Sequence, residues 1–269
     1  MKNKRLTIFL SIFLFFAVIV VLTSTVFSLD NVTVKFLSTT NILTNQEEQI
    51  VQSGSFRFGE NVFFSNKAKY AKNIEKANPY IRVVNIETVF PNKFVVNAVE
   101  RNECFVIKFS AGPNKNKYAV TDERMKVLNI LDNYQNSTSN GIEIIGTDLG
   151  AQNVSLGDFF ETDINYFTNL FDSFREWKIS YLDIKARVKS IQPNYEKQNR
   201  LLVNMRSGVQ IIIENSNSQT SDKLNLAFSF YDTKTDKNGN DVDYTKSGII
   251  LITENQSKIY GLYKPMNES

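Results

Sequence analysis

The first 29 residues of the chain combine a short basic start with a long apolar run. Lys2, Lys4 and Arg5 precede residues 6–29, in which no side chain is charged and most are Leu, Ile, Val or Phe. A helix of roughly 20 or more such residues is long enough to cross a bilayer. The pattern therefore predicts a cytoplasmic tail over 1–5 and a transmembrane helix over 6–29.

The charges on either side of this run predict its orientation. Basic residues flanking a span stay on the cytoplasmic side. The N-terminus is therefore expected inside and everything after Asp30 outside, as in a single-pass type II protein. A cleaved signal peptide is the alternative, with Val26-Phe27-Ser28 as its cleavage site. The apolar run to Leu22 is longer than the usual signal core, which favours an uncleaved anchor.

Residues 30–101 begin with a strand and a short helix. Val32, Val34 and Phe36 alternate with polar residues, which predicts a strand that leaves the membrane directly. Thr44-Asn45-Gln46-Glu47 is a capping box, so a helix is expected to start there. Gly54 is expected to end this helix, because glycine accepts the left-handed conformation common at helix C-termini.

A second helix and a hairpin complete this region. Ser65 is expected to cap a helix that stops before Pro79, since proline disfavours the α conformation in the residue before it. A turn at Pro91-Asn92 is expected to join two half-buried strands. The helix should bury Tyr70, Ala71, Ile74 and Ala77, and the strands Val84, Ile86, Phe90, Phe94, Val96 and Ala98. The order over 30–101 is β-α-α-β-β.

Residues 102–263 show a second series of strands with two helices, followed by a C-terminal tail over 264–269. Phe160, Ile164, Phe167, Phe171 and Phe174 recur at helical spacing and predict a helix over 158–177. A shorter helix is expected over 222–231. Strands are expected at 105–109, 118–120, 127–131, 142–145, 184–191, 201–205, 209–213, 248–253 and 258–263. The fold class is α+β: a transmembrane helix, a β-α-α-β-β domain and a mixed β-rich domain.

Composition argues against most catalytic chemistry. The 269 residues include no histidine and one cysteine, and the net charge is +3. The chain therefore lacks the commonest general base and zinc ligand, and Cys104, in an apolar run, is expected to be a buried thiol. No phosphate-binding or nucleophile motif is present. Residues 236–241 resemble a calcium loop weakly, with the glycine misplaced and Ser247 where a glutamate is needed. We expect no catalytic, cofactor or metal site.

Four short motifs carry a resemblance to a known family. They are Gly59-x-Asn61-Val62-Phe63, Asn78-Pro79-Tyr80-Ile81, Phe90-Pro91-Asn92 and Val99-Glu100-Arg101. Their order behind one membrane anchor resembles the POTRA domain of the cell-division proteins FtsQ and DivIB. The chain departs from the family at Asn102-Glu103, where proline is frequent, and at Met125, where a glycine is expected. Met205-Arg206-Ser207-Gly208, Lys223-Leu224 and the last two strands resemble the family's β domain.

The resemblance implies a divisome scaffold of the septum. Its partners would be bitopic coiled-coil proteins of the FtsB/DivIC and FtsL type, together with the septal peptidoglycan synthase complex. The alternatives are an anchored extracellular wall-modifying enzyme and a POTRA-bearing protein of another assembly. No nucleic-acid partner is expected, since the small charge is spread along the chain.

The last strand is the expected docking site for a partner. It comes last in the sequence, so its outer side is predicted to be an edge able to receive an added strand. In the resembling family the terminal strand docks the FtsB-type partner, which implies Ser257, Lys258, Ile259, Tyr260, Gly261, Leu262 and Tyr263 here. The alternative is that these aromatic residues only pack under the sheet.

Overall fold

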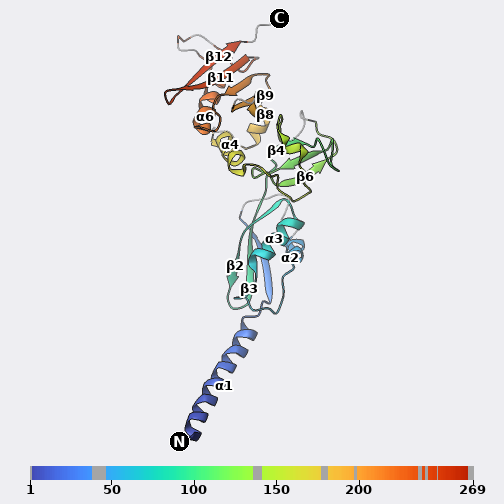
Figure 1. Ribbon diagram of the computed structural model, residues 1–269, viewed down its shortest axis with the longest axis vertical. Helices are drawn as coiled ribbons and strands as arrows, with labels where there is room; N and C mark the ends of the chain where they lie inside the picture. The colour runs from blue at the N-terminus through green and yellow to red at the C-terminus, as the bar shows by residue number, and fades with distance from the viewer. Residues whose placement is uncertain are drawn as a thin grey trace. The chain divides into compact units, whose positions relative to one another are not determined.

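The computed structural model describes residues 2–265 apart from 38–46, 136–140, 177–180, 197–198, 236–237, 240–241 and 247. The chain divides into two compact units, Met1–Arg101 and Asn102–Ser269. Each unit has its own hydrophobic core. The two units are described separately below, with the elements labelled as in Figure 1.

The first unit begins with α1 (Lys2–Val26). Within the described part of the chain it is the one helix long and apolar enough to cross a membrane, over Ile8–Val26. The helix ends three residues earlier than predicted. Ser28 pairs with Asn61 in an isolated β-bridge, and Leu29 is 1% exposed in the core of the following domain. These last apolar residues are therefore used for packing in the domain.

The rest of the first unit is a three-stranded sheet with two helices (Figure 1). Its elements are β1 (Asn31–Phe36), α2 (Glu47–Gly54), α3 (Lys67–Ala77), β2 (Ile81–Val89) and β3 (Lys93–Glu100). The predicted β-α-α-β-β order is confirmed. The strand order is β1-β3-β2, with β1 parallel and β2 antiparallel to the central β3. Ile50, Tyr70 and Ile74 of the helices share a buried core with Phe94, Val96 and Ala98 of β3.

Two local predictions in this unit are wrong. Asn66, not Ser65, caps α3: its side-chain oxygen accepts a hydrogen bond from the Lys69 N–H at 3.0 Å. In β2 a bulge between Val83 and Asn85 shifts the alternation. Val84 is consequently exposed, while Ile81 and Ile86 are buried. Phe90 is also exposed, because it lies beyond the end of β2 in the turn to β3. The capping box at 44–47 begins outside the described residues.

The second unit is built on one sheet of nine strands, β4 to β12 (Figure 1). Their spatial order is β12-β11-β10-β9-β8-β7-β4-β5-β6. The strands are β4 (Phe105–Lys108), β5 (Tyr118–Thr121), β6 (Val127–Leu131), β7 (Ile142–Ile144), β8 (Val188–Tyr195), β9 (Arg200–Met205), β10 (Gln210–Ile213), β11 (Gly248–Asn255) and β12 (Lys258–Pro265). The remaining elements are η1 (Asp148–Ala151), α4 (Ile164–Glu176), α5 (Tyr181–Arg187) and α6 (Thr220–Tyr231).

Two further boundaries differ from the prediction. Helix α4 begins at Ile164, because the Asp163 carboxylate accepts the Tyr166 N–H at 3.1 Å and so caps the first turn. Phe160 is buried in the core although it precedes the helix. The strand expected from Ile184 begins at Val188, since residues up to Arg187 form α5.

The turn at Asp122–Met125 uses a non-glycine residue in the left-handed region. Met125 has φ of 63° and a fully buried side chain. One carboxylate oxygen of Asp122 accepts the N–H groups of Arg124 and Lys126, each at 2.9 Å. The side chain of Asp122 therefore holds the turn closed although Met125 stands where a glycine was expected.

Candidate docking edge

Strand β12 lies at one end of the nine-stranded sheet and pairs with β11 alone. Six of the seven residues predicted for docking, Lys258 to Tyr263, lie in this strand. Ser257 lies in the turn before it. Gln256 and Ser257 have φ of 49° and 61°, which is the signature of a tight type I′ hairpin turn. We call the outer side of Lys258–Pro265 the β12 edge.

The register of the hairpin indicates which backbone groups face outward. Asn255 pairs with Lys258 across the two-residue turn, so this pair is the first hydrogen-bonded one. Hydrogen-bonded and non-hydrogen-bonded pairs alternate in an antiparallel ladder. The N–H groups of Tyr260 and Leu262 are thus directed to β11, and those of Ile259 and Gly261 away from it.

The two faces of β12 have different roles. On the inner face, Ile259 and Tyr263 pack against the core of the unit, and the Tyr263 ring lies 4.3 Å from that of Tyr244. On the other face, Tyr260 and Leu262 are 47% and 52% exposed. The edge therefore offers outward backbone donors beside two exposed apolar side chains.

Gly261 is needed by the fold itself. A Cβ atom at this position would lie 2.5 Å from the Phe230 ring of α6. Since real Cβ contacts are longer than this, any other residue would force the Phe230 ring to move. The absence of a side chain at Gly261 thus leaves room for the Phe230 ring of α6 against β12.

The opposite end of the sheet is partly covered. Strand β6 is the edge strand at this end. The Val127 N–H of β6 donates to the Asp158 carbonyl at 2.8 Å, and the Val127 carbonyl accepts the Gly157 N–H at 2.9 Å. Among the described residues, no segment pairs in this way with the outer side of β12. The β12 edge is the more open of the two.

A buried ion pair supports this end of the sheet, and sequence reasoning missed it. Lys223 of α6 is fully buried, and its Nζ lies 2.8 Å from Glu254 Oε2 in β11 and 3.0 Å from the Asn215 carbonyl oxygen. The available signal was spacing, because Lys223 lies four residues before the buried Ala227 on the same side of the helix.

Further titratable side chains of this unit are also buried. No group of three His, Cys, Asp or Glu side chains placed to hold a metal ion occurs among the described residues. Cys104 is fully buried, with Sγ 3.9 Å from Glu123 Oε2. Burial lowers the pKa of Lys185 to about 8, against the opposing attraction of Cys104 and Glu103. The calcium-like stretch 236–241 lies mostly outside the described residues.

Comparison with known proteins gives two matches. Residues 33–101 match the POTRA domain, FtsQ-type. The chain is also 28% identical over 211 residues to the cell division protein DivIB of Clostridium tetani, an alignment that covers 77% of this chain and 71% of that protein. The first match spans the sheet and helices of the first unit from β1 to the end of β3. The second is long enough to reach into both units.

Proposed function

On the basis of its confirmed resemblance to the FtsQ/DivIB family, we propose that this chain is a non-enzymatic divisome scaffold. It is anchored in the cell membrane by α1 and acts at the division septum. Its partners are bitopic proteins of the FtsB/DivIC and FtsL type, through which it connects to the septal peptidoglycan synthase complex. Both folded units lie outside the cell, in agreement with Lys2, Lys4 and Arg5 before the span and Asp30 after it.

The observation that carries this proposal is the open β12 edge. An exposed strand edge presents unpaired backbone groups that can accept a strand from another chain. In such strand addition, backbone hydrogen bonds supply affinity and alternate side chains supply specificity. The outward N–H groups of Ile259 and Gly261 would serve the first role, and Tyr260 and Leu262 the second.

The test is capture of the partners by the full-length chain from membranes that contain the DivIC-type and FtsL-type proteins of the same genome. Ile259→Pro removes an outward donor and is expected to reduce capture at least about tenfold. Ile259→Ala is the matched control, because it loses the same side-chain packing and keeps the N–H. Tyr260→Pro is less informative, since the register directs that donor to β11.

The contribution of the exposed side chains of β12 to partner capture is tested separately. Leu262→Ser is expected to weaken capture, whereas Val84→Ser, an equally exposed apolar residue of β2, should leave it unchanged. Capture of both Ile259→Pro and Leu262→Ser at the wild-type level would place the docking site elsewhere.

The division role is tested in cells and the scaffold role in vitro. A fluorescent fusion of the full chain should concentrate at midcell in dividing cells. Uniform distribution over the membrane would contradict a septal role. Purified protein incubated with cell-wall material should release no fragments, and release would favour the wall-modifying enzyme.

A further inference from the structure

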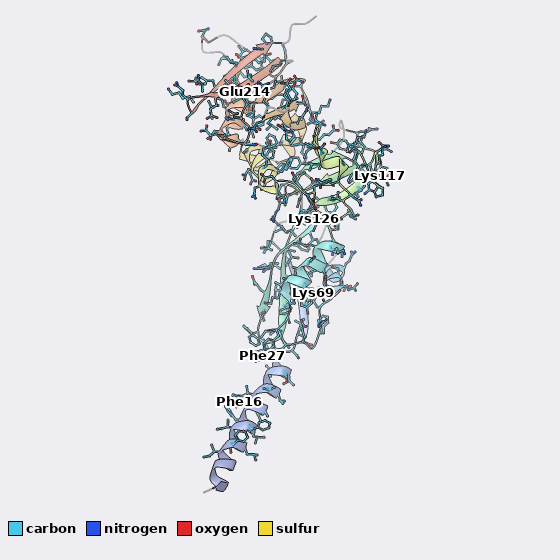
Figure 2. The ribbon with its side chains drawn as sticks, viewed as in Figure 1. Phe16, Phe27, Lys69, Lys117, Lys126 and Glu214 are labelled. Atoms are coloured by element: carbon cyan, nitrogen blue, oxygen red, sulfur yellow. The ribbon has the colours of Figure 1, made fainter. Side chains whose placement is uncertain are left out.

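Three phenylalanines gather where α1 ends and the folded domain begins. The Phe27 ring lies 5.1 Å from that of Phe63 and 6.2 Å from that of Phe90, and Phe63 and Phe90 are 5.4 Å apart. They come from three separate segments: the residue after α1, the loop before α3, and the turn between β2 and β3. We call Phe27, Phe63, Phe90 and the adjacent Phe64 the juxtamembrane phenylalanine cluster. Figure 2 shows Phe27 at this junction.

The rings of the cluster lie close together, yet most of them are largely exposed. Phe63, Phe64 and Phe90 are 58%, 89% and 60% exposed. The neighbouring Val89 is also exposed, at 45%. A contiguous group of large apolar side chains on the outside of a folded domain is unusual in water and marks a surface that meets an apolar partner.

The backbone fixes this cluster to the end of the helix. The Val62 N–H donates to the Phe27 carbonyl at 2.9 Å, and the Leu29 N–H donates to the Glu60 carbonyl at 2.8 Å. On the hairpin side, the Asp30 N–H donates to the Asn92 carbonyl at 2.9 Å. No linker separates α1 from the domain, so the loop before α3 and the hairpin turn lie level with the end of the helix (Figure 1).

We propose that the juxtamembrane phenylalanine cluster inserts into the boundary between headgroups and acyl chains of the membrane that α1 crosses. The apolar surface of α1 runs through Val26 directly into Phe27, so the lipid that covers the helix is next to the cluster. Amphipathic and aromatic side chains at this depth bury apolar area and anchor a protein at the interface. The proposal depends on α1 crossing the membrane and not on the β12 edge.

The charges around the cluster indicate that the attraction is apolar. Within three residues of the cluster in the sequence lie two positive residues, Lys67 and Lys93, and three negative ones, Asp30, Glu60 and Glu87. This set of charges gives no net attraction to anionic lipid. Binding should therefore be similar in neutral and anionic bilayers. Its consequence is that the β2–β3 turn rests on the membrane, which orients the three-stranded sheet relative to the bilayer.

The test uses tryptophan fluorescence in the full-length chain. Trp177 is the only tryptophan, so Trp177→Phe gives a silent background into which Phe64→Trp is introduced. The protein is reconstituted at one chain per nanodisc in lipid brominated in the upper acyl chain. Contact with the bromines is expected to quench roughly half of the emission relative to unbrominated lipid, with a blue-shifted maximum. Phe90→Trp in the same background is a second, independent probe on the hairpin turn.

Val84→Trp is the matched control. It is as exposed as Phe63 but lies six residues before Phe90 along β2, about 20 Å away in an extended strand. It should show no quenching. Unquenched, red-shifted emission from both cluster probes would mean that the cluster faces water. Blue-shifted emission without quenching would mean that protein covers it. Either result overturns the proposal.

Discussion

Lys223 Nζ and Glu254 Oε2 lie 2.8 Å apart and join the buried face of α6 to the far end of β11. Lys223 is fully buried, whereas the Glu254 side chain is 19% exposed. The pair sits one residue before Asn255, where the β11–β12 hairpin turns. The ion pair therefore stabilises the end of β11, the strand with which β12 pairs.

Replacing Glu254 should lower the free energy of unfolding more than replacing Lys223. Glu254→Gln leaves a buried ammonium without a counter-charge, and we expect a loss of about 2–4 kcal/mol in the free energy of unfolding. Lys223→Met keeps the apolar stem and leaves a carboxylate that water can reach, so about 0–2 kcal/mol is expected. Urea unfolding in detergent, followed by Trp177 fluorescence, measures both. The reverse order of stabilities would contradict this account.

Met125→Gly should destabilise the second unit although it relieves an unfavourable backbone. Relief of the left-handed conformation is worth about 1 kcal/mol. Loss of the buried side chain costs about 2–5 kcal/mol. This loss exceeds the backbone relief, so the variant should be less stable than the wild type. Asn116→Gly is the control, because Asn116 has φ of 69° but is exposed. It should be neutral or slightly stabilising in the same unfolding experiment. A stabilising Met125→Gly would refute this reasoning.

Lys185 should make stability rise with pH on the alkaline side. Burial lowers its pKa from 10.5 to about 8 in the folded state. Below pH 8 the side chain is charged in both states, and the folded state bears the desolvation penalty. Between pH 8 and 10.5 the folded state has released a proton that the unfolded state still binds, so stability increases with pH by roughly 1–3 kcal/mol. Lys185→Met should remove this increase. A rise of the same size in Lys185→Met would assign it to another group.

Glu75 should be needed for the bulge in β2. One oxygen accepts the Val83 N–H at 2.8 Å, and the other pairs with Arg101 Nη2 at 2.9 Å. Glu75→Ala should therefore speed amide hydrogen exchange at Val83 and destabilise the first unit by about 1–3 kcal/mol. Lys72→Ala, at an exposed position of the same helix, is the control. Unchanged exchange at Val83 would show that the bulge forms without this carboxylate.

Strands and helices whose apolar residues recur at one regular spacing could be predicted from the sequence. Strand β3 buries Phe94, Val96 and Ala98 as alternation requires. The neighbouring β2 could not be predicted in the same way, because the bulge inserts a residue and moves Val84 to the exposed side. The start of α4 was mistaken because Phe160 is buried from a loop and extends the aromatic spacing beyond the helix. Asp163 carried the correct signal.

For the candidate site, the sequence predicted which strand forms the edge but not the geometry of that edge. Being last in the sequence pointed to β12 as an edge strand. The direction of each N–H, however, depends on the turn at Gln256-Ser257 and on the register with β11. The role of Gly261 depends on where α6 places Phe230. Gln256-Ser257 lacks the Asn-Gly or Gly-Gly signature of a type I′ turn, so the sequence did not indicate this turn type. The contact of Gly261 with Phe230 joins elements distant in the sequence, and no local pattern encodes it.

The parallel pairing of β1 with β3 has a consequence for biogenesis. β3 is the central strand of its sheet and also the last to be synthesised, so β1 has no partner until residues 93–100 are available. On the proposed orientation, β1 would leave the translocation channel first and wait for some sixty more residues to follow. Non-local pairing of this kind folds late. On this orientation, β1 would be open to chaperones during the interval, and we expect the domain to become protease-resistant only after Glu100 has been exported.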